Sequence, residues 1–489
     1  MKRIPLIVLA ILMATMYVVR AEESSQAAKT EQPNILVILA DDMGWGQPGY
    51  QGGAIIPTPS IDSLAREGTS LTQFYVQPVC TPTRAAFLTG RYAFRNGSMI
   101  RFGFNNISGM LQDERTIAEA LQDAGYWTAI VGKWHLGSWQ KEHLPMQRGF
   151  DYQYGHYAAV IDYKYKMRGD VYDWHRNEEP LDEDGYSTDL IGAEAARLIK
   201  EHDGTKPFFM YVPFNAPHGP HTMAPEEVTR KYSKEKVKSP GQAANVEIMD
   251  KAIGRILDAV DAKGIRDNTL VVFFNDNGGP KLAVHRNGPY KGYKTEYYEG
   301  GVRVACLLRW PDKLEAGSTN DEMFNCVDLY PTLLNLAGAS LEQPLPLDGY
   351  DIWKSLTEGT PSPRTEIAHS TKTIRMGDWK YIDETEEYYS FKAEVSQLYN
   401  IAEDPGEENN LVDQYPEKVE EFKSRMAYWA ALERPAEEFV PIAGYPVYIC
   451  GEEENAILSD ALKEKIDRIR KSGDSFKSKY RLQAGDKRD

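Results

Sequence analysis

The sequence predicts an α/β protein with a large, mostly parallel sheet flanked by helices, followed by a smaller unit of short strands and a helix. In the first two-thirds of the chain, short apolar runs such as residues 34–39 (NILVIL) alternate with segments of helical period. Buried strands that alternate with helices indicate a parallel sheet covered on both faces. After about residue 345, prolines and short strand-like pieces replace this alternation.

The helices and strands of the first part are predicted from the periodicity of apolar residues and from residues that end helices. Glycines such as Gly125 and Gly264 follow the apolar pattern where a helix should stop. In chain order, we expect a strand at 34–39, helices at 61–67 and 116–124, a strand at 127–131, a helix at 187–202, a strand at 208–212, a helix at 243–263, strands at 270–274 and 302–308, and a helix at 328–337.

The second part reads as a smaller unit. We expect a short helix near Trp353, strands at 372–376, 379–382 and 397–399, a turn at 404–407 and a helix at 416–432. Residues 459–489 are highly charged and read as a helix with a frayed end. We therefore divide the chain into a leader (1–21), an α/β domain (22–345) and a C-terminal α+β subdomain with a charged helical tail (346–489).

The N-terminus has the pattern of a secretory signal peptide. Lys2 and Arg3 precede an apolar run at 4–19, and small residues surround a plausible cleavage site at about residue 21. The run is too short and wrongly flanked for a transmembrane helix, although an uncleaved N-terminal anchor is the alternative. We expect an exported protein, periplasmic or extracellular, with no membrane association after cleavage.

The charge of the chain argues against a nucleic-acid partner. Removing residues 1–21 takes away three basic residues and no acidic one, which changes the formal net charge from −16 to −19. Nucleic-acid binding needs a basic surface. An anionic small substrate would need a local basic pocket in this acidic surface.

Cysteine use excludes a disulfide scaffold. The chain has 4 cysteines, which is few for an exported protein. Cys306 and Cys326 flank a turn-like segment and could pair, and buried free thiols are the other reading. The other two are Cys80 and Cys450.

Ionisable or amide side chains follow four of the expected strands. In α/β sheets ligands bind beyond the carboxyl ends of the strands, so these side chains mark one candidate site. Carboxylate and amide oxygens suit Ca²⁺ or Mg²⁺ rather than zinc. The residues are Asp41 and Asp42, Lys133 and His135, His218, and Asp276 and Asn277.

Residues 80–91 (CTPTRAAFLTGR) carry the most specific signal in the chain. They resemble the C-x-P-[ST]-R-x-x-x-L-T-G-R signature of the type I sulfatases, with Thr83 where the family more often has Ser. Three further segments are similar to that family: GKWHLG at 132–137, NAPH at 215–218, and KGYK at 291–294 before EGGVRV. The resemblance implies an alkaline-phosphatase-like fold for the α/β domain and a small antiparallel sheet packed by a helix after it.

The resemblance also implies a modified nucleophile and a metal. Cys80 would be oxidised to formylglycine (3-oxoalanine) by a formylglycine-generating maturase, and one hydroxyl of its hydrate would attack the sulfur of a sulfate ester. The other hydroxyl would then expel sulfate. A Ca²⁺ ion, with Mg²⁺ the less favoured choice, would be held by Asp41, Asp42, Asp276, Asn277 and residue 80.

The family assigns roles to the remaining motif residues. Arg84 would stabilise the hydrate, and Lys133 and Lys294 would bind sulfate oxygens. His135 would be the base that triggers sulfate release. His218 would contact the bridging oxygen and, with Lys294, protonate the leaving alkoxide. Together these cations and the metal would form a positive hole for a sulfate monoester.

The substrate pocket lies outside these motifs. Residues 148–163 (RGFDYQYGHYAAVIDY) look similar to the arylsulfatase B branch and bacterial polysaccharide sulfatases, which suggests a sulfated galactan or galactosaminoglycan. Aromatic faces beside polar groups suit sugar binding, and an arginine suits a further anion. An ordinary packed insertion is the alternative. The candidate substrate contacts are His156, Asp162, Tyr163, Trp174, His175 and Arg176.

Two other functions fit parts of the pattern. Phosphate or phosphonate ester hydrolases share the fold, but Lys133 and Lys294 at sulfatase positions argue against them, and the ratio of sulfate to phosphate ester turnover separates the two. A non-enzymatic binder of sulfated polymers with an unmodified Cys80 is the third possibility. It conflicts with the complete set of expected site residues.

Overall fold

The computed structural model describes residues 32–100, 102, 108–169, 171–232, 237–283, 287–436 and 459–472. The expected signal peptide, Cys450 and the last part of the charged tail lie outside these residues. Within the described ranges, no helix is both long enough and apolar enough to span a bilayer.

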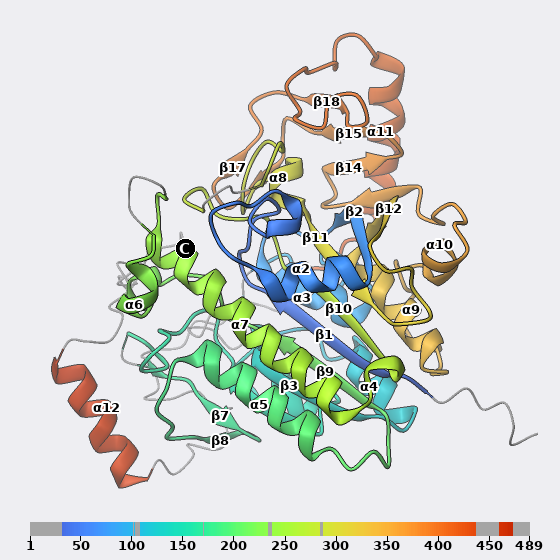
Figure 1. Cartoon of the computed structure of the whole chain (residues 1–489). Helices are drawn as coiled ribbons and strands as arrows, with labels where there is room; N and C mark the ends of the chain where they lie inside the picture. The colour runs from blue at the N-terminus through green and yellow to red at the C-terminus, as the bar shows by residue number, and fades with distance from the viewer. Residues whose placement is uncertain are drawn as a thin grey trace, which may run out of the picture.

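A ten-stranded mixed sheet forms the centre of the molecule (Figure 1). Five parallel strands lie side by side in its middle: β10 (Thr269–Asn275), β1 (Asn34–Ala40), β9 (Phe208–Pro213), β3 (Trp127–Lys133) and β4 (Tyr152–His156). Antiparallel pairs join further strands at both edges of this group. Beyond β10 follow β11 (Arg303–Arg309), β2 (Thr69–Tyr75) and β12 (Ser318–Asn325), and beyond β4 follow β7 (His175–Arg176) and β8 (Glu179–Pro180).

Helices cover both faces of the sheet, because the buried strands are apolar on both sides. Ile35 and Val37 of β1 point into one apolar cluster, and Leu36 and Ile38 point into the other. The first cluster is closed by α3 (Cys80–Thr89), α4 (Ile117–Asp123) and α9 (Leu329–Leu336), and the second by α2 (Pro59–Glu67), α5 (Ser187–Glu201) and α7 (Pro240–Lys263). In Figure 1 the second set of helices lies in front of the sheet.

Helix boundaries follow the expected local signals. Thr116 caps α4 in a reciprocal capping box, since its hydroxyl accepts the Glu119 N–H and the Glu119 carboxylate accepts the Thr116 N–H. Gly264 ends α7 in the left-handed region, with φ 74°. The predicted helices at 116–124 and 243–263 are therefore confirmed to within a few residues.

Asp250 of α7 holds the start of α2. Its carboxylate accepts the backbone N–H groups of Ser60 (3.1 Å) and Ile61 (2.9 Å), which have no partner inside the helix. Burial raises the pKa of Asp250 from 3.8 to about 6, although these hydrogen bonds act in the opposite direction.

The raised pKa of the Asp250 carboxyl makes the free energy of unfolding depend on pH in a defined direction. Between the unfolded and folded pKa values of Asp250 the folded state binds the proton more tightly, so its contribution to the free energy of unfolding falls as pH rises from about 4 to about 6. We expect Asp250→Asn to flatten this dependence in thermal unfolding curves recorded across that range. A variant that keeps the wild-type slope would exclude Asp250 as its source.

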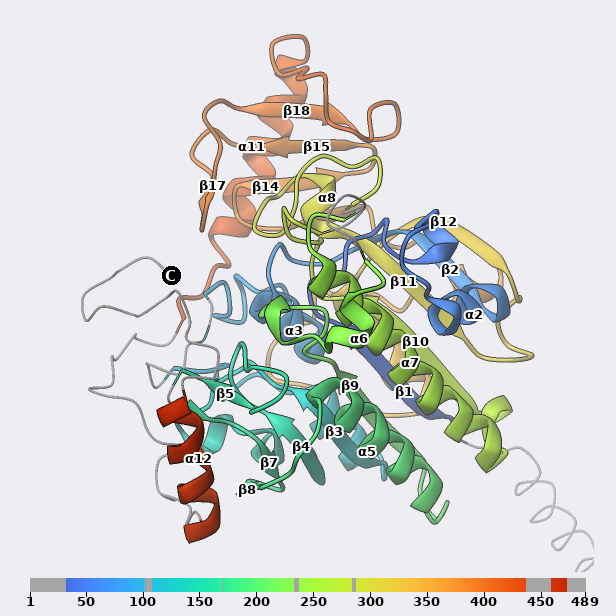
Figure 2. The same ribbon diagram turned by 60° about the vertical axis from the view of Figure 1, so that its left-hand side comes forward.

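The C-terminal subdomain is a four-stranded antiparallel sheet packed by one helix, as predicted. Phe422 and Trp429 of the helix join the first apolar cluster together with Tyr381 of the sheet. Figure 2 shows this subdomain stacked beyond the β11–β2–β12 end of the large sheet. Its elements are β13 (Glu366–Ala368), β14 (Thr373–Met376), β15 (Trp379–Ile382), β18 (Gln397–Asn400) and α11 (Pro416–Ala430), after the short α10 (Trp353–Thr357).

The charged tail helix packs elsewhere. Leu462, Ile466 and Ile469 of α12 (Asp460–Ser472) are buried in the second apolar cluster of the α/β domain, and Lys465 pairs with Asp184 at 2.9 Å. The helix thus lies on the α/β domain rather than on the subdomain to which its sequence position assigns it (Figure 2). The remaining short elements are α6 (Glu226–Thr229), α8 (Glu299–Val302), β5 (Met167–Arg168), β6 (Val171–Tyr172), β16 (Glu387–Tyr388) and β17 (Phe391–Lys392).

Candidate active site

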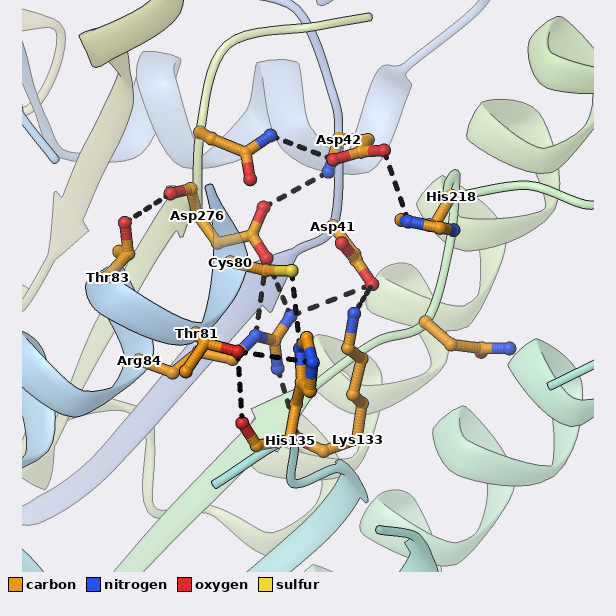
Figure 3. A network of polar contacts seen from close by, with 12 residues as sticks. Asp41, Asp42, Cys80, Thr81, Thr83, Arg84, Lys133, His135, His218 and Asp276 are labelled. Carbon is orange, nitrogen blue, oxygen red and sulfur yellow. Dashed lines mark hydrogen bonds and ion pairs between the residues drawn. The ribbon is translucent and has the colours of Figure 1, made fainter. Parts of the chain in front are cut away.

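The polar residues expected at the strand ends meet at the carboxyl edge of the parallel strands (Figure 3). Asp41 and Asp42 follow β1, His218 follows β9, and Asp276 begins the loop after β10. Lys133 is the last residue of β3. The first turn of α3 lies beside them, so residues far apart in sequence come together in one site.

Cys80 is the first residue of α3 and is 3% exposed. Its Sγ atom lies 3.3 Å from Nδ1 of His135, and the Oγ1 atom of Thr81 lies 3.1 Å from Nε2 of the same ring. The imidazole is therefore held between the first two side chains of the helix. Only glycine fits at position 132, where φ is 141°, because the Cβ atom of any other residue would lie 2.0 Å from the Pro213 carbonyl oxygen.

Two further side chains anchor α3 to the loop after β10. Thr83 donates a hydrogen bond to the backbone carbonyl of Asp276 at 2.5 Å, so a threonine hydroxyl makes this contact at the position where the family more often has serine. Arg84 is fully buried and pairs with Asp276 Oδ2 at 2.8 Å, while its Nη1 donates to the Lys133 carbonyl at 3.1 Å. The guanidinium thus lies beneath residue 80 rather than at the surface.

Each lysine of the site contacts one aspartate. Lys133 Nζ lies 2.6 Å from Asp41 Oδ2, and Lys294 Nζ lies 2.6 Å from Asp42 Oδ1. His218 Nε2 lies 3.5 Å from Asp42 Oδ2. Because Lys294 and His218 retain 17% and 23% exposure, they form the part of the site nearest to solvent.

Several buried oxygens suit a hard divalent cation. Asp41 Oδ1 and Asn277 Oδ1 are buried without a hydrogen-bond partner among the described residues. Ligand atoms of Asp41, Cys80 and Asp276 lie within 4.8 Å of one another. Asp42 joins this group, since Asn277 Nδ2 donates to its Oδ1 at 2.8 Å. Orphaned oxygens beside crowded carboxylates fit Ca²⁺ or Mg²⁺, because these hard cations prefer oxygen ligands.

The site perturbs the ionisation of its own groups. Burial, together with repulsion from Asp41, raises the pKa of Asp276 to about 6. Burial also lowers the pKa of His218 to about 3, and the charges of Lys294 and Lys133 act in the same direction. For Asp42, burial alone would raise the pKa, but Lys294 and His218 bring it well below its ordinary value. His218 is therefore neutral at neutral pH and the Asp42 carboxyl is ionised.

Five of the six expected substrate contacts are buried, and Arg176 is partly exposed. His156 ends β4 and lies near Lys133 and Arg84, where burial lowers the pKa of its imidazole to about 3. His175 stacks on Tyr157 at 4.5 Å between ring centroids.

The other four side chains have partners inside the fold. Trp174 packs against Tyr154, with ring centroids 5.1 Å apart. Asp162 accepts the backbone N–H of Met167 at 3.2 Å and so closes its own loop. Arg176 pairs with Glu194 of α5 at 3.6 Å. Each of these contacts lies within the protein, and the assignment of these residues to substrate binding stays a prediction.

Tyr163 makes contacts in the site that the sequence pattern did not indicate. Its hydroxyl donates to the backbone carbonyls of Asn215 (3.0 Å) and His218 (2.5 Å), and its ring stacks on Tyr186 at 4.9 Å. Tyr163 therefore fixes the loop that carries His218. No local pattern marks such a residue, because the contact joins segments more than fifty positions apart.

Cys306 and Cys326 are free thiols buried in the first apolar cluster. Burial raises the pKa of both thiols, so they remain protonated. Of the two readings of this pair, the structure shows the buried free thiols rather than the disulfide.

Comparison with known proteins agrees with the geometry. The sulfatase family model matches residues 33–339, and a model for the C-terminal region of N-sulphoglucosamine sulphohydrolase matches residues 293–431. Arylsulfatase J of Mus musculus is 36% identical over 368 residues, which are 72% of this chain but only 61% of that protein. N-acetylgalactosamine-6-sulfatase of Mus musculus is 32% identical over 383 residues, 72% of each chain.

Among solved structures, Ps i-CgsB in complex with k-i-k-neocarrahexaose superposes with a TM-score of 0.76 at 30% identity, covering 84% of this chain and 95% of that one. The alkaline-phosphatase-like α/β fold with a small antiparallel subdomain, predicted from the sequence, is thereby confirmed. Since the sulfatase model spans more than half of the 489 residues, and the strand-end residues of its motifs surround one buried cleft, this chain belongs to the sulfatase family of sulfuric ester hydrolases.

Proposed function

We propose that the protein hydrolyses sulfate monoesters on a sulfated carbohydrate of the galactan or galactosaminoglycan type. The observation that carries this proposal is that Arg84, Lys133 and Lys294 each pair with Asp41 or Asp42 in the same group of residues as Cys80, in which Figure 3 shows Arg84 and Lys133 beside Cys80. Buried cations aimed at one point stabilise the negative charge that develops in sulfuryl transfer. The carbohydrate class is supported by relatives whose names or bound ligands are sugars.

Two groups would complete the site. A divalent cation, for which we propose Ca²⁺, would be held by Asp41, Asp42, Asp276, Asn277 and residue 80, and would supply Lewis-acid polarisation of a sulfate oxygen. Formylglycine, made from Cys80 by a maturase, would supply a hydrated aldehyde as the nucleophile. A cation would also compete with Lys133 and Lys294 for the carboxylates, which leaves their ammonium groups available to the substrate.

The protein's own side chains then bind and move protons. Lys133 and Lys294 bind sulfate oxygens. The buried guanidinium of Arg84 stabilises negative charge that develops on residue 80. His135 takes up a proton at residue 80, since its Nδ1 lies 3.3 Å from the Cys80 side chain. Lys294 donates a proton to the leaving oxygen. The neutral His218 Nε2 takes part in this proton transfer.

The cellular setting is part of the same proposal. The signal-like leader at 1–21 supports export to the periplasm or the extracellular space, where sulfated polysaccharides are encountered. The maturase is the expected partner during biosynthesis, because the motif around Cys80 is its recognition sequence in this family.

Released sulfate from defined esters tests this function. Protein matured in a formylglycine-competent host is incubated with chondroitin 4-sulfate disaccharide, ι-carrageenan oligosaccharides, a small aryl sulfate and the matching aryl phosphate. We expect sulfate release from the aryl sulfate and from one sugar class. Preferential turnover of the phosphate ester would instead favour the phosphate or phosphonate hydrolase alternative.

Lys294 offers a direct test of the sulfate-binding arrangement. We expect Lys294→Met to lower kcat/KM for the aryl sulfate by about 10²- to 10³-fold, because removing a charge donor at the reacting group costs that much in comparable sites. Lys200→Gln, on the exposed end of α5, is the matched control and should retain full activity. Wild-type activity in Lys294→Met would remove this lysine from the mechanism.

A further inference from the structure

A cavity of about 780 Å³ lies beside the catalytic cleft. Its walls come from the loop after β1, which includes Gly46 and Gln51, and from the loop after β10, which includes Lys281 and Tyr290. Lys238, just before α7, closes a third side. This volume falls within the range of small-molecule sites and is large enough for a sugar unit.

The same two loops carry the catalytic residues. The first begins with Asp41 and Asp42, and the second begins with Asp276 and Asn277. The second loop is tied to itself by Asn287, whose side chain accepts the Gly279 N–H at 2.8 Å and donates to the Gly292 carbonyl at 3.0 Å. Lys294 donates its own backbone N–H to the Gly279 carbonyl at 3.2 Å. Asn287 and Gly292, which line the cavity, are therefore linked by hydrogen bonds through Gly279 to Lys294.

The lining of the cavity is basic in an acidic protein. Among the described residues it contains three lysines and no aspartate or glutamate, whereas the whole chain has a formal net charge of −16. An aromatic wall lies beside them, formed by Tyr290 packed on Trp45 with ring centroids 5.0 Å apart. Lysines next to an aromatic side chain suit an anionic sugar.

The three lysines differ in how strongly their ammonium groups interact with other residues of the protein. Lys291 donates to the Glu407 carbonyl at 3.0 Å and lies 4.1 Å from the centroid of the Tyr298 ring, so it anchors the C-terminal subdomain. Lys238 and Lys281 are both exposed and form no ion pair with any residue that the structure describes, and Lys281 Nζ lies 5.6 Å from the centroid of the Tyr293 ring. These two ammonium groups are therefore available to a ligand in the cavity.

We propose that this cavity is a second anion subsite, in which Lys238 and Lys281 bind a sulfate or carboxylate on the sugar next to the one whose ester is cleaved. The inference rests on the proposed function, since it assumes a saccharide in the neighbouring cleft. It assigns selection of a polyanionic chain to residues that line this cavity, among them Gly46, Lys238, Lys281 and Tyr290.

Saccharide binding by an inactive protein tests the subsite independently of turnover. In the Cys80→Ala background, calorimetry measures Kd for two tetrasaccharides, one from ι-carrageenan with sulfates only and one from chondroitin 4-sulfate with uronate carboxylates. We expect the added pair Lys238→Gln and Lys281→Gln to weaken binding by about 3- to 20-fold, as two exposed ion pairs would. The dependence of Kd on salt should also become shallower.

A control variant and a second measurement keep this test decisive. Lys200→Gln removes one exposed lysine at the other end of the sheet and should leave Kd unchanged. Equal thermal unfolding midpoints show that the double variant is folded. Weaker binding of only one tetrasaccharide would identify the anion that the subsite takes.

Two results would overturn the inference. One is unchanged affinity of the double variant for both tetrasaccharides, and the other is no binding of either by the Cys80→Ala protein. Neither bears on the sulfatase activity itself, which turnover of the small aryl sulfate by the mature enzyme reports separately. Failure of that turnover would contradict the proposed function instead.

Discussion

Cys80→Ala is expected to abolish sulfate ester hydrolysis and to leave the fold intact. The side chain at position 80 is the only nucleophile that the proposed reaction uses, and removing such a group typically lowers kcat by on the order of 10⁴- to 10⁶-fold. Alanine fits the position, because Cys80 lies in the first turn of α3 and, within the described ranges, its Sγ atom has one hydrogen-bond contact, with His135. Sulfate release and thermal unfolding measure the two effects.

Cys306→Ala is the matched control for this variant. Cys306 is equally buried and free, but it lies in β11 within the apolar cluster. We expect it to lose some stability and to retain turnover. Mass spectrometry of the peptide that carries residue 80 in the active protein should show loss of the sulfur atom. Full activity in Cys80→Ala would end the formylglycine account.

Chelation of the divalent cation is expected to remove activity and to lower the unfolding midpoint together. Asp41, Asp42 and Asp276 crowd three carboxylates into a buried space, and Asp41 Oδ1 and Asn277 Oδ1 have no hydrogen-bond partner in the described part of the chain. A cation at 1,000 times its Kd would stabilise the folded state by about 4 kcal/mol, because it binds only that state. Adding Ca²⁺ back should restore both readouts.

Paired variants locate this effect at the site. Asp41→Asn should lose the calcium dependence of its unfolding midpoint, whereas Asp250→Asn, another buried carboxylate, should retain it. Titration with Mg²⁺ in place of Ca²⁺ decides between the two ions. A chelated protein with full activity and an unchanged midpoint would show that these oxygens hold no functional metal.

The sequence predicted the elements whose local pattern matches their environment. The continuous apolar run at 34–39 predicts a strand that is buried on both faces, and β1 is fully buried from Ile35 to Ala40. Two strands at one side of the sheet, β12 at its edge and β2 next to it, were missed for the converse reason. β12 (STNDEMFN) is polar and partly exposed, and β2 (TSLTQFY) lacks a clean alternation, so neither differs from a loop in sequence.

The residues of the site also divide into those whose position the sequence predicted and those whose position it did not. Motif spacing placed Cys80 and Arg84 one helical turn apart, and strand-end position predicted that Asp41, Lys133 and Asp276 would meet at one edge. The burial of Trp174 and His175 could not be predicted, because aromatic and polar residues suit a sugar site and a packed insertion equally well. Only the surrounding segments decide which of the two they form.

Most of the helices, several of the central strands, the class of the fold and the candidate site residues could be predicted from the sequence alone, since the periodicity of apolar residues and the spacing of motifs are local properties. Tertiary structure decided which lysine contacts which aspartate, that Tyr163 holds the His218 loop, that α12 docks on the α/β domain, and that a basic cavity opens beside the cleft. Each of these depends on contacts between segments distant in sequence, whose pairing is set by the packing of the whole chain.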